Sequence, residues 1–192
     1  MNWLELVAVI AGLFCVYLII IRSIWCWPVG LIQVSVYVWI FYHAKLYSDV
    51  GLHIIYIGLQ LYGWWHWLYG GPGKNQLPVK KLSTRGLIAC VAISLVGSTS
   101  LGIIMTRYTD ASLPFADAFT TVASLTAQWL LTRKYLQNWY FWIAVDVVAI
   151  FVYASKALYM TSALYGLFLC MAIAGLVAWR NERAVTREMQ VA

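Results

Sequence analysis

Residues 4–21 of the chain read LELVAVIAGLFCVYLIII, and this stretch decides the class of fold. As an α-helix it rises about 27 Å at 1.5 Å per residue, close to the thickness of the hydrocarbon core of a membrane. A strand of a closed β-barrel is the alternative in lipid, but it needs apolar and polar residues in alternation. The run LIII at 18–21 does not alternate. The stretch therefore predicts a membrane-spanning α-helix.

Six further apolar stretches follow the first one. With it, the predicted spans are residues 4–21, 24–42, 50–68, 87–105, 115–131, 139–154 and 160–179. The 192 residues are 63% hydrophobic and only 10% charged, against about 25% charged in a soluble domain. The mean hydropathy of +0.77 excludes a soluble enzyme, a disordered regulator and a nucleic-acid reader, because a soluble fold cannot bury so much apolar surface. We expect an all-α membrane protein with seven transmembrane helices.

The distribution of charge predicts the orientation of these helices. Seven spans leave ten Lys and Arg residues on one side and three on the other, namely Lys45, Arg107 and Lys156. The positive-inside rule places the larger group in the cytoplasm. We therefore expect a multi-pass protein of the bacterial inner membrane, with a periplasmic N-terminus and a cytoplasmic C-terminus. No basic segment precedes residues 4–21, so we expect no cleaved signal peptide.

The sequence also matches itself at an offset of 112 residues. The pairs that carry the match are Trp27 with Trp139, Gly63 with Gly175, and Trp67 with Trp179. Chance in a tryptophan-rich chain is the alternative explanation. Three spans in each copy require one spacer span if both copies are to have the same orientation, which gives 3+1+3 parallel repeats. The expected parts are a first three-helix repeat at 1–69, a cytoplasmic loop and linker helix at 70–112, a second three-helix repeat at 113–180 and a cytoplasmic tail at 181–192.

Polar and aromatic side chains share helical faces in several spans. Gln60, Trp64 and Trp67 follow each other at spacings of four and three residues, and these spacings place them on one face. Other spans have similar faces. The residues that we expect to line a substrate site are Gln33, Tyr37, Gln60, Trp64, Trp67, Gln128, Asn138, Trp139, Trp142 and Asp146.

Simpler interpretations of these residues stay open. Tryptophans near span ends, such as Trp67 and Trp139, also form interfacial belts, and amides also hydrogen-bond between helices. Asp146 is a functional-site candidate because carboxylates are costly in lipid, although it could pair with a neighbouring Tyr or Gln. Together these faces predict a pocket with tryptophan walls, which suits a flat, nitrogen-containing, cationic ring. The amides and the carboxylate could hold the hydroxyls of an attached arm.

The histidines and cysteines indicate no cofactor and no metal. His43, His53 and His66 are not placed in facing pairs of the kind that bind haem. The four cysteines lack metal-ligand spacing, and we expect them to be buried free thiols. With no nucleophile and base in a recognisable arrangement, the sequence does not predict an enzyme.

Several of these strings resemble the PnuC-type vitamin transporters of bacteria, known for nicotinamide riboside uptake. The resemblance covers roughly residues 3–182, and its most specific parts are YGWWHW at 62–67, SLTAQ at 124–128, TRK at 132–134 and the stretch from Asn138 to Asp146. It implies a SWEET-like 3+1+3 fold, a homotrimer and facilitated uptake of a small-molecule vitamin, with no nucleic acid involved. It also implies coupling to a cytoplasmic kinase, because phosphorylation of the vitamin drives uptake in this family.

The resemblance leaves the vitamin open. Nicotinamide riboside is favoured because it is the frequent substrate of the family, and thiamine, which also has a flat cationic ring and a hydroxylated arm, is the first alternative. The family also includes riboflavin carriers. Gln60 and Asp146 stand where some riboside carriers have Asn, and this difference keeps thiamine in contention. The second alternative is a proton-coupled transporter that uses Asp146.

Overall fold

The computed structural model describes residues 3–43, 45, 47–71, 77–109 and 111–191, and within these ranges the chain forms seven helices and no β-strand. The helices are α1 (Trp3–Ile20), α2 (Cys26–His43), α3 (Tyr47–Tyr69), α4 (Thr84–Tyr108), α5 (Pro114–Thr132), α6 (Asn138–Ser155) and α7 (Tyr159–Val191). Each of the seven predicted spans coincides with one helix. The all-helical prediction is therefore confirmed.

The main difference in helix length is at the end of the chain. The predicted last span ends at residue 179, whereas α7 continues to Val191. Residues 180–191 contain neither Gly nor Pro and are rich in Arg and Glu, which are good helix formers. Hydropathy marks where the apolar part of a helix ends, but the backbone continues as a helix until a residue interrupts it.

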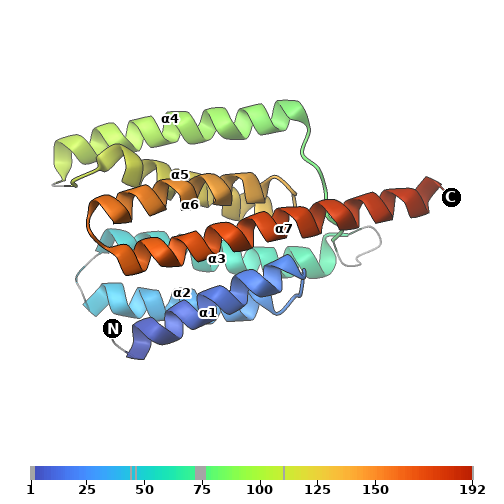
Figure 1. Cartoon of the computed structure of the whole chain (residues 1–192), viewed down its shortest axis with the longest axis horizontal. Coiled ribbons are helices and arrows are strands. Elements are labelled where there is room, and N and C mark those ends of the chain that lie inside the picture. Colours follow the sequence, from blue (N-terminus) through green and yellow to red (C-terminus); the bar gives the residue numbers. More distant parts are fainter. Residues whose placement is uncertain (1–2, 44, 46, 72–76, 110, 192) are drawn as a thin grey trace.

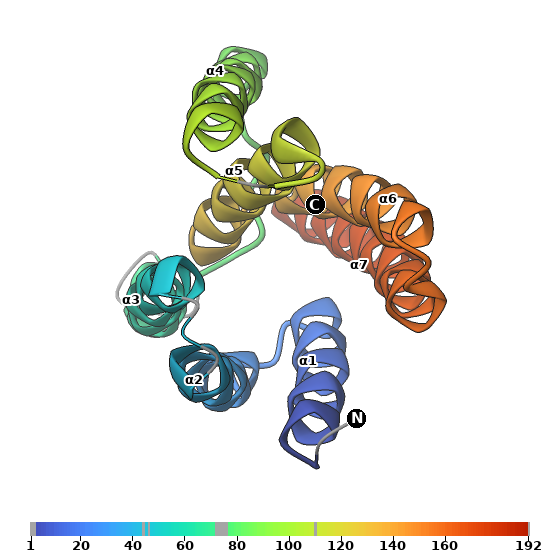
Figure 2. The ribbon, with the colours of Figure 1, turned by 90° about the vertical axis from the view of Figure 1, so that its left-hand side faces the viewer.

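Six of the helices form a ring, which is visible when the bundle is viewed along its axis (Figure 2). The contacts run from α1 to α2, α3, α5, α6 and α7, and α7 returns to α1. Helix α4 lies outside this ring and packs on α5 (Figure 1). The ring therefore consists of a first half, α1–α3, and a second half, α5–α7, which meet along the α3–α5 and α1–α7 contacts.

The turns in the two halves have the same backbone conformation. Among the residues that the structure describes, four non-glycine residues have positive φ. They are Arg22, Lys45, Lys134 and Ala157, at 59°, 57°, 56° and 56°. Arg22 and Lys134 end α1 and α5, and they are 112 positions apart. The N–H of Arg22 donates to the carbonyl of Ile19 at 3.0 Å, and the N–H of Lys134 donates to that of Leu131 at 2.8 Å. Both helices thus end in the same left-handed cap.

Four buried tryptophans form a layer across the bundle beside these turns. This tryptophan layer consists of Trp27, Trp67, Trp139 and Trp179, none more than 2% exposed. Trp27 meets Trp67 edge to face, with ring centroids 5.2 Å apart and planes at 86°. Trp139 meets Trp179 in the same way, at 5.6 Å and 86°. This is a favoured aromatic geometry, and it occurs once in each half.

Two hydrogen bonds of the tryptophan layer join the halves. The indole Nε1–H of Trp67 donates to the carbonyl of Leu131 at 3.0 Å. The Nε1–H of Trp179 donates to the carbonyl of Ile19 at 3.1 Å. Both donors and both acceptors are 112 positions apart in the chain. Because lipid supplies little hydrophobic drive for helix association, packing and hydrogen bonds of this kind hold such bundles together.

Glycines make room for two of the indoles. A Cβ atom on Gly63 of α3 would collide with the ring of Trp27, and one on Gly175 of α7 would collide with the ring of Trp139. Only glycine allows the helix backbone to approach the ring so closely. The matched glycines at the 112-residue offset therefore have the same packing role in both halves.

The surface of the bundle is apolar, while polar side chains lie inside. Ile10, Ile32, Ile93 and Phe151 are all more than 55% exposed, the reverse of a soluble protein. By length and composition alone, α4, α6 and residues 159–184 of α7 could each cross a membrane. The interior amides of α2, α3 and α5 lower the mean hydropathy of those helices.

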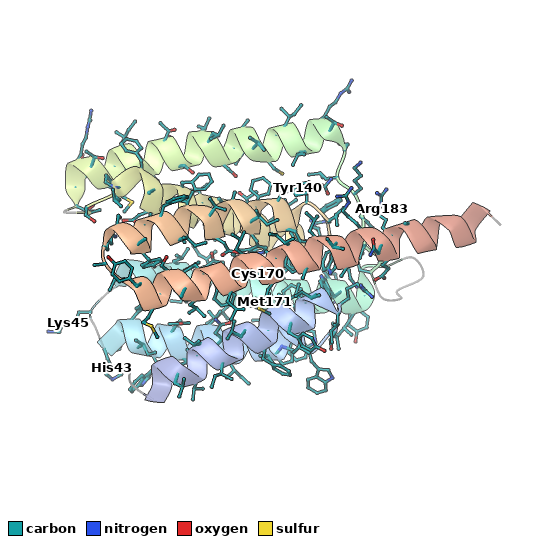
Figure 3. The ribbon with its side chains drawn as sticks, in the orientation of Figure 1. His43, Lys45, Tyr140, Cys170, Met171 and Arg183 are labelled. Atoms are coloured by element: carbon teal, nitrogen blue, oxygen red, sulfur yellow. The ribbon has the colours of Figure 1, made fainter. Side chains whose placement is uncertain are left out.

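The cysteines only partly match the expectation of burial. All four are free thiols, and Cys15 and Cys26 are buried, whereas Cys90 is half-buried and Cys170 is exposed. The expectation is wrong for Cys170 because it lies on the outer face of α7, where Figure 3 labels it beside Met171. An apolar thiol in that position fits a lipid-facing surface.

The two ends of the bundle differ in charge. Arg22, Lys134 and Arg183 lie near the tryptophan layer, at what we call the basic end, and His43 and Lys45 lie at the opposite end (Figure 3). Arg22 forms an ion pair with Glu182. Lys134 is 6% exposed and its ammonium lies 4.3 Å from the centre of the Trp67 ring. Burial, aided by the nearby Arg22, lowers the pKa of the Lys134 ammonium to about 8, against the opposing effect of Glu182.

Candidate functional site

A cavity of about 580 Å³ lies between the two halves of the ring. Its lining comes from both halves, with α1, α2 and α3 on one side and α5, α6 and α7 on the other. The volume falls within the range of about 300–1,000 Å³ that is typical of small-molecule sites. At one end the cavity meets the tryptophan layer, and its lining continues toward the opposite end as far as Phe41 and Thr161.

Indole rings form the floor of the cavity. Trp27 and Trp139, the two members of the tryptophan layer that line it, are joined by Trp142. The Nε1–H groups of Trp27 and Trp139 are buried and have no hydrogen-bond acceptor among the described residues. The same holds for the Nε2 donor of Gln128, which also lines the cavity. Buried donors without partners are costly, so these three groups beside one cavity would gain from acceptors on a bound molecule.

Aromatic side chains form the walls at equivalent positions of the two halves. Phe41, His53 and Tyr56 of the first half correspond, at the 112-residue offset, to residues of the second half that also line the cavity, namely Tyr153, Tyr165 and Phe168. The rings of Tyr153 and Tyr165 stack 5.2 Å apart, with planes at 19°. In the first half, Phe41 and His53 meet edge to face, with planes at 61°. The stacked pair of the second half therefore offers the flat wall that suits a planar ligand.

The polar groups of the cavity differ between the two halves. Asp146 is 5% exposed and is the only carboxylate among the described residues that line the cavity. Its equivalent in the first half is Val34, and the equivalent of Gln60 is Ala172. A buried carboxylate is costly when it is ionised, and a cationic ligand held beside it by the aromatic rings would offset that cost.

A hydrogen bond near the cavity links the halves. The hydroxyls of Tyr56 on α3 and Ser124 on α5 lie 2.6 Å apart, and both residues line the cavity. The Ser124 hydroxyl also lies 3.0 Å from the carbonyl of Thr121 on the preceding turn, which accepts from it. Together with the indole bond from Trp67 to Leu131, this contact holds α3 against α5 at two depths.

Most of the predicted site residues come together at this cavity. Those that line it are Gln33, Tyr37, Gln60, Gln128, Trp139, Trp142 and Asp146. They come from four helices far apart in the sequence. That they contact substrate stays a prediction.

Trp64, Trp67 and Asn138 do not line the cavity, so the structure does not bring these three together with the rest of the predicted set. Trp67 shares the inward face of α3 with Gln60, but it lies about 10 Å further along the helix axis, within the tryptophan layer. Trp64 packs against the same hydrophobic cluster. Asn138 is fully buried at the start of α6, where its amide donates to the carbonyl of Tyr135 at 2.7 Å. Helical spacing gave the correct face but not the depth at which the cavity ends.

Several lining residues were missing from the predicted set. Tyr56, His53 and Tyr165 are the clearest examples, joined by Ser124 and Thr121, which were recognised only as a polar helix face. The signal that could have found them is the repeat, because His53 and Tyr165 are 112 positions apart. Tyr56 also precedes Gln60 by one helical turn on the same face.

Comparison with known proteins agrees with this architecture. The family model described as nicotinamide mononucleotide transporter matches residues 2–181. The nicotinamide riboside transporter PnuC of Escherichia coli (strain K12) is 26% identical over 207 residues, covering 95% of this chain and 87% of the relative. The riboflavin/roseoflavin transporter RibM of Streptomyces davaonensis is 26% identical, covering 92% of this chain and 84% of its own length.

A solved structure shows the same fold. The crystal structure of the vitamin B3 transporter PnuC superposes with a TM-score of 0.71 at 28% identity, covering 93% of this chain and 81% of that one. These relatives are transporters, which places the chain among transport proteins and not among enzymes. The apolar helices agree with a multi-pass membrane protein. The match to the family model spans nearly the whole chain, and the protein therefore belongs to the nicotinamide mononucleotide transporter family.

Proposed function

We propose that this protein carries nicotinamide riboside across the bacterial inner membrane. The observation that carries the proposal is the cavity between the halves, in which the single carboxylate of Asp146 faces a space with aromatic walls and an indole floor. Nicotinamide riboside has a flat pyridinium cation and a ribose with several hydroxyls. Aromatic faces and a carboxylate attract the cation, and the unpartnered donors of Gln128 and Trp139 would meet the ribose oxygens or the carboxamide.

Transport through this cavity would occur by alternating access between two like-oriented repeats. Support comes from the equivalent turns, indole contacts and glycines of α1–α3 and α5–α7, which fit a SWEET-like 3+1+3 arrangement with α4 as the linker. The repeats would correspond to residues 1–69 and 113–180. On this view the tryptophan layer closes the cavity at the basic end. Opening there requires the indole bonds to Leu131 and Ile19 to break.

The basic end would face the cytoplasm. Support for this orientation comes from the cations gathered there, such as Arg22 and Lys134, according to the positive-inside rule. The N-terminus is then periplasmic. The chain would work as a homotrimer, and a cytoplasmic kinase would drive net uptake by phosphorylating the vitamin. The support for these two features is the family resemblance.

Thiamine and riboflavin are the competing substrates. Thiamine also has a flat cation, so Asp146 would favour it as well. Riboflavin is a larger and neutral ring system, and one relative is named a riboflavin/roseoflavin transporter. A binding screen of purified protein against the three vitamins separates these candidates. We expect the tightest binding for nicotinamide riboside, and tighter binding of either other vitamin would overturn the substrate assignment.

Proton coupling is the alternative mechanism, and the position of Asp146 favours it specifically. This residue is a buried carboxylate beside the substrate cavity, where a proton could be carried. A counterflow assay in proteoliposomes without an ion gradient distinguishes the mechanisms. A facilitator exchanges labelled for unlabelled riboside at zero gradient, and a protonophore leaves its rate unchanged. Net uptake that collapses with a protonophore would instead establish proton coupling.

A further inference from the structure

An aromatic stack runs along the outer side of the contact between α3 and α5. The ring of Tyr62 lies parallel to that of His66, with centroids 5.5 Å apart, and also parallel to that of Trp129, at 5.7 Å. Both interplanar angles are 9°. The guanidinium of Arg133 lies over the Trp129 ring at 4.8 Å from its centroid and over the Tyr62 ring at 5.6 Å. The stack therefore holds Arg133 in place at the basic end.

Arg133 has an unfilled donor in this position. Its Nε–H is buried and has no acceptor among the described residues. The described carboxylates lie elsewhere, since Asp117 and Glu182 are in ion pairs with other cations and Asp146 lines the cavity. A guanidinium presents its donors as a planar fork that matches a phosphate or carboxylate. Arg133 is thus oriented by ring stacking without the anion that such a fork usually binds.

A second cation is fixed beside it. The N–H of Lys80 donates to the carbonyl of Lys134 at 2.9 Å, and the carbonyl of Lys80 accepts from the N–H of Leu136 at 2.8 Å. These bonds tie the segment before α4 to the turn that follows Arg133. Arg133 and Lys80 are the two cations that act electrostatically on His66. The side chain of Lys80 is exposed, so it is free to bind an anion next to Arg133.

The surroundings of this pair belong to the membrane surface. Trp65 is 57% exposed, Tyr69 54% and Trp129 43%, and all three lie within about two helical turns of the basic end. Exposed indoles and phenols of this kind are typical of the headgroup region of a bilayer. Further along α3 the exposed side chains are aliphatic, as at Leu61. An anion bound by Arg133 and Lys80 would therefore be at headgroup depth, with acyl chains along α3.

We propose that Arg133 and Lys80 form a binding site for the phosphate of an anionic phospholipid, such as phosphatidylglycerol, on the outer face of the α3–α5 contact. Basic pockets between transmembrane helices on the cytoplasmic side are known binding sites for acidic headgroups. This contact joins the two halves of the ring, and it also contains the indole bond from Trp67 to Leu131. A lipid bound here would hold the halves together at the basic end.

The test measures retention of phosphatidylglycerol by the purified full-length protein, with native mass spectrometry and lipid titration in nonionic detergent. We expect one lipid per chain to be retained against phosphatidylcholine as competitor. Arg133→Gln should raise the dissociation constant about tenfold, as expected for loss of a charge-assisted hydrogen bond, and Lys80→Gln about threefold. The matched control is Arg180→Gln, which removes the same charge from an exposed position on α7 and should change binding less than about twofold.

Four results would overturn the proposal. Equal retention by the parent and Arg133→Gln would show that Arg133 takes no part in binding. An equal loss in Arg180→Gln would reduce the effect to general surface charge. If millimolar inorganic phosphate displaced the lipid and stabilised the protein against heat as much as the lipid does, the site would bind free anions instead. If light scattering showed that Arg133→Gln dissociates an oligomer, the residue would instead belong to a contact between protomers. Lys80→Gln changes an exposed side chain outside the helices, so it keeps the test decisive if Arg133→Gln does not fold.

Discussion

Replacing Gly63 by Ala should destabilise the bundle, and replacing Gly175 should do so to a similar extent. In each case the new methyl group would collide with a buried indole, Trp27 or Trp139, and these rings are only 1% and 2% exposed. The edge-to-face contacts with Trp67 and Trp179 restrain these two rings. Overpacking of this kind costs about 1–3 kcal/mol.

The same substitution also has a favourable effect, which needs its own control. Alanine is a better helix former than glycine by about 1 kcal/mol. Gly58 in α3 and Gly166 in α7 have no atom within 4 Å of an added Cβ, so Gly58→Ala and Gly166→Ala show the helix effect alone. Relative to the control in the same helix, Gly63→Ala and Gly175→Ala should each be less stable by about 1–3 kcal/mol.

Chemical unfolding in nonionic detergent, followed by tryptophan fluorescence, measures these differences. The fluorescence reports directly on the tryptophan layer, because its four indoles are buried in the native state. The reasoning fails if the two variants are as stable as their controls. It also fails if the two costs differ by more than about 1 kcal/mol, since equivalent packing in the two halves predicts similar costs.

Three further predictions concern the cavity and the basic end. Trp142→Ala should weaken binding of nicotinamide riboside at least about tenfold in titration calorimetry, as expected for loss of an aromatic wall over a cation, whereas Trp64→Ala should lower stability and leave the affinity of the folded fraction unchanged. Asp146→Asn should weaken binding of the cationic riboside by about 1.5–3 kcal/mol and leave neutral riboflavin unaffected, and an equal loss for both vitamins would contradict a charge-selective role. Burial lowers the pKa of Lys134 from 10.5 to about 8, so the unfolded chain binds more protons than the folded one between these pH values, and stability should rise with pH there. The difference between the melting temperatures of the parent and of Lys134→Met should therefore shift in favour of the parent from pH 8 to pH 10. Melting temperatures that change with pH in the same way in both proteins would refute this.

The sequence was sufficient to predict the helices because their signal is local. Apolar runs such as 4–21 are bounded by charged turns. In lipid such a run must satisfy its own backbone hydrogen bonds, and a helix does so. The tryptophans and glycines at the 112-residue offset were also visible in the sequence. Their roles were not, because the collision that Gly63 avoids involves Trp27 on another helix. Contacts of that kind depend on how helices pack, which hydropathy does not encode.

Helical spacing predicts which residues share a side of the helix but not the depth at which a cavity ends. Gln60 and Trp67 share an inward face, yet only Gln60 lines the cavity, because the tryptophan layer fills the bundle around Trp67. Asn138 lies outside the cavity, at the start of α6. The partner of Tyr56, the hydroxyl of Ser124, lies 68 positions away in the chain, and no spacing rule connects the two. Residues of this kind become visible only when the two halves are placed against each other.

The central claim is that the two halves of the ring enclose the substrate between them, with its cationic ring beside Asp146. The most direct test is an experimental structure of the protein with saturating nicotinamide riboside. The account predicts density for the pyridinium between the aromatic walls, within contact distance of Asp146 and Trp142, with the ribose near Gln128. Density for the riboside elsewhere, with this cavity empty or filled by side chains, would contradict it.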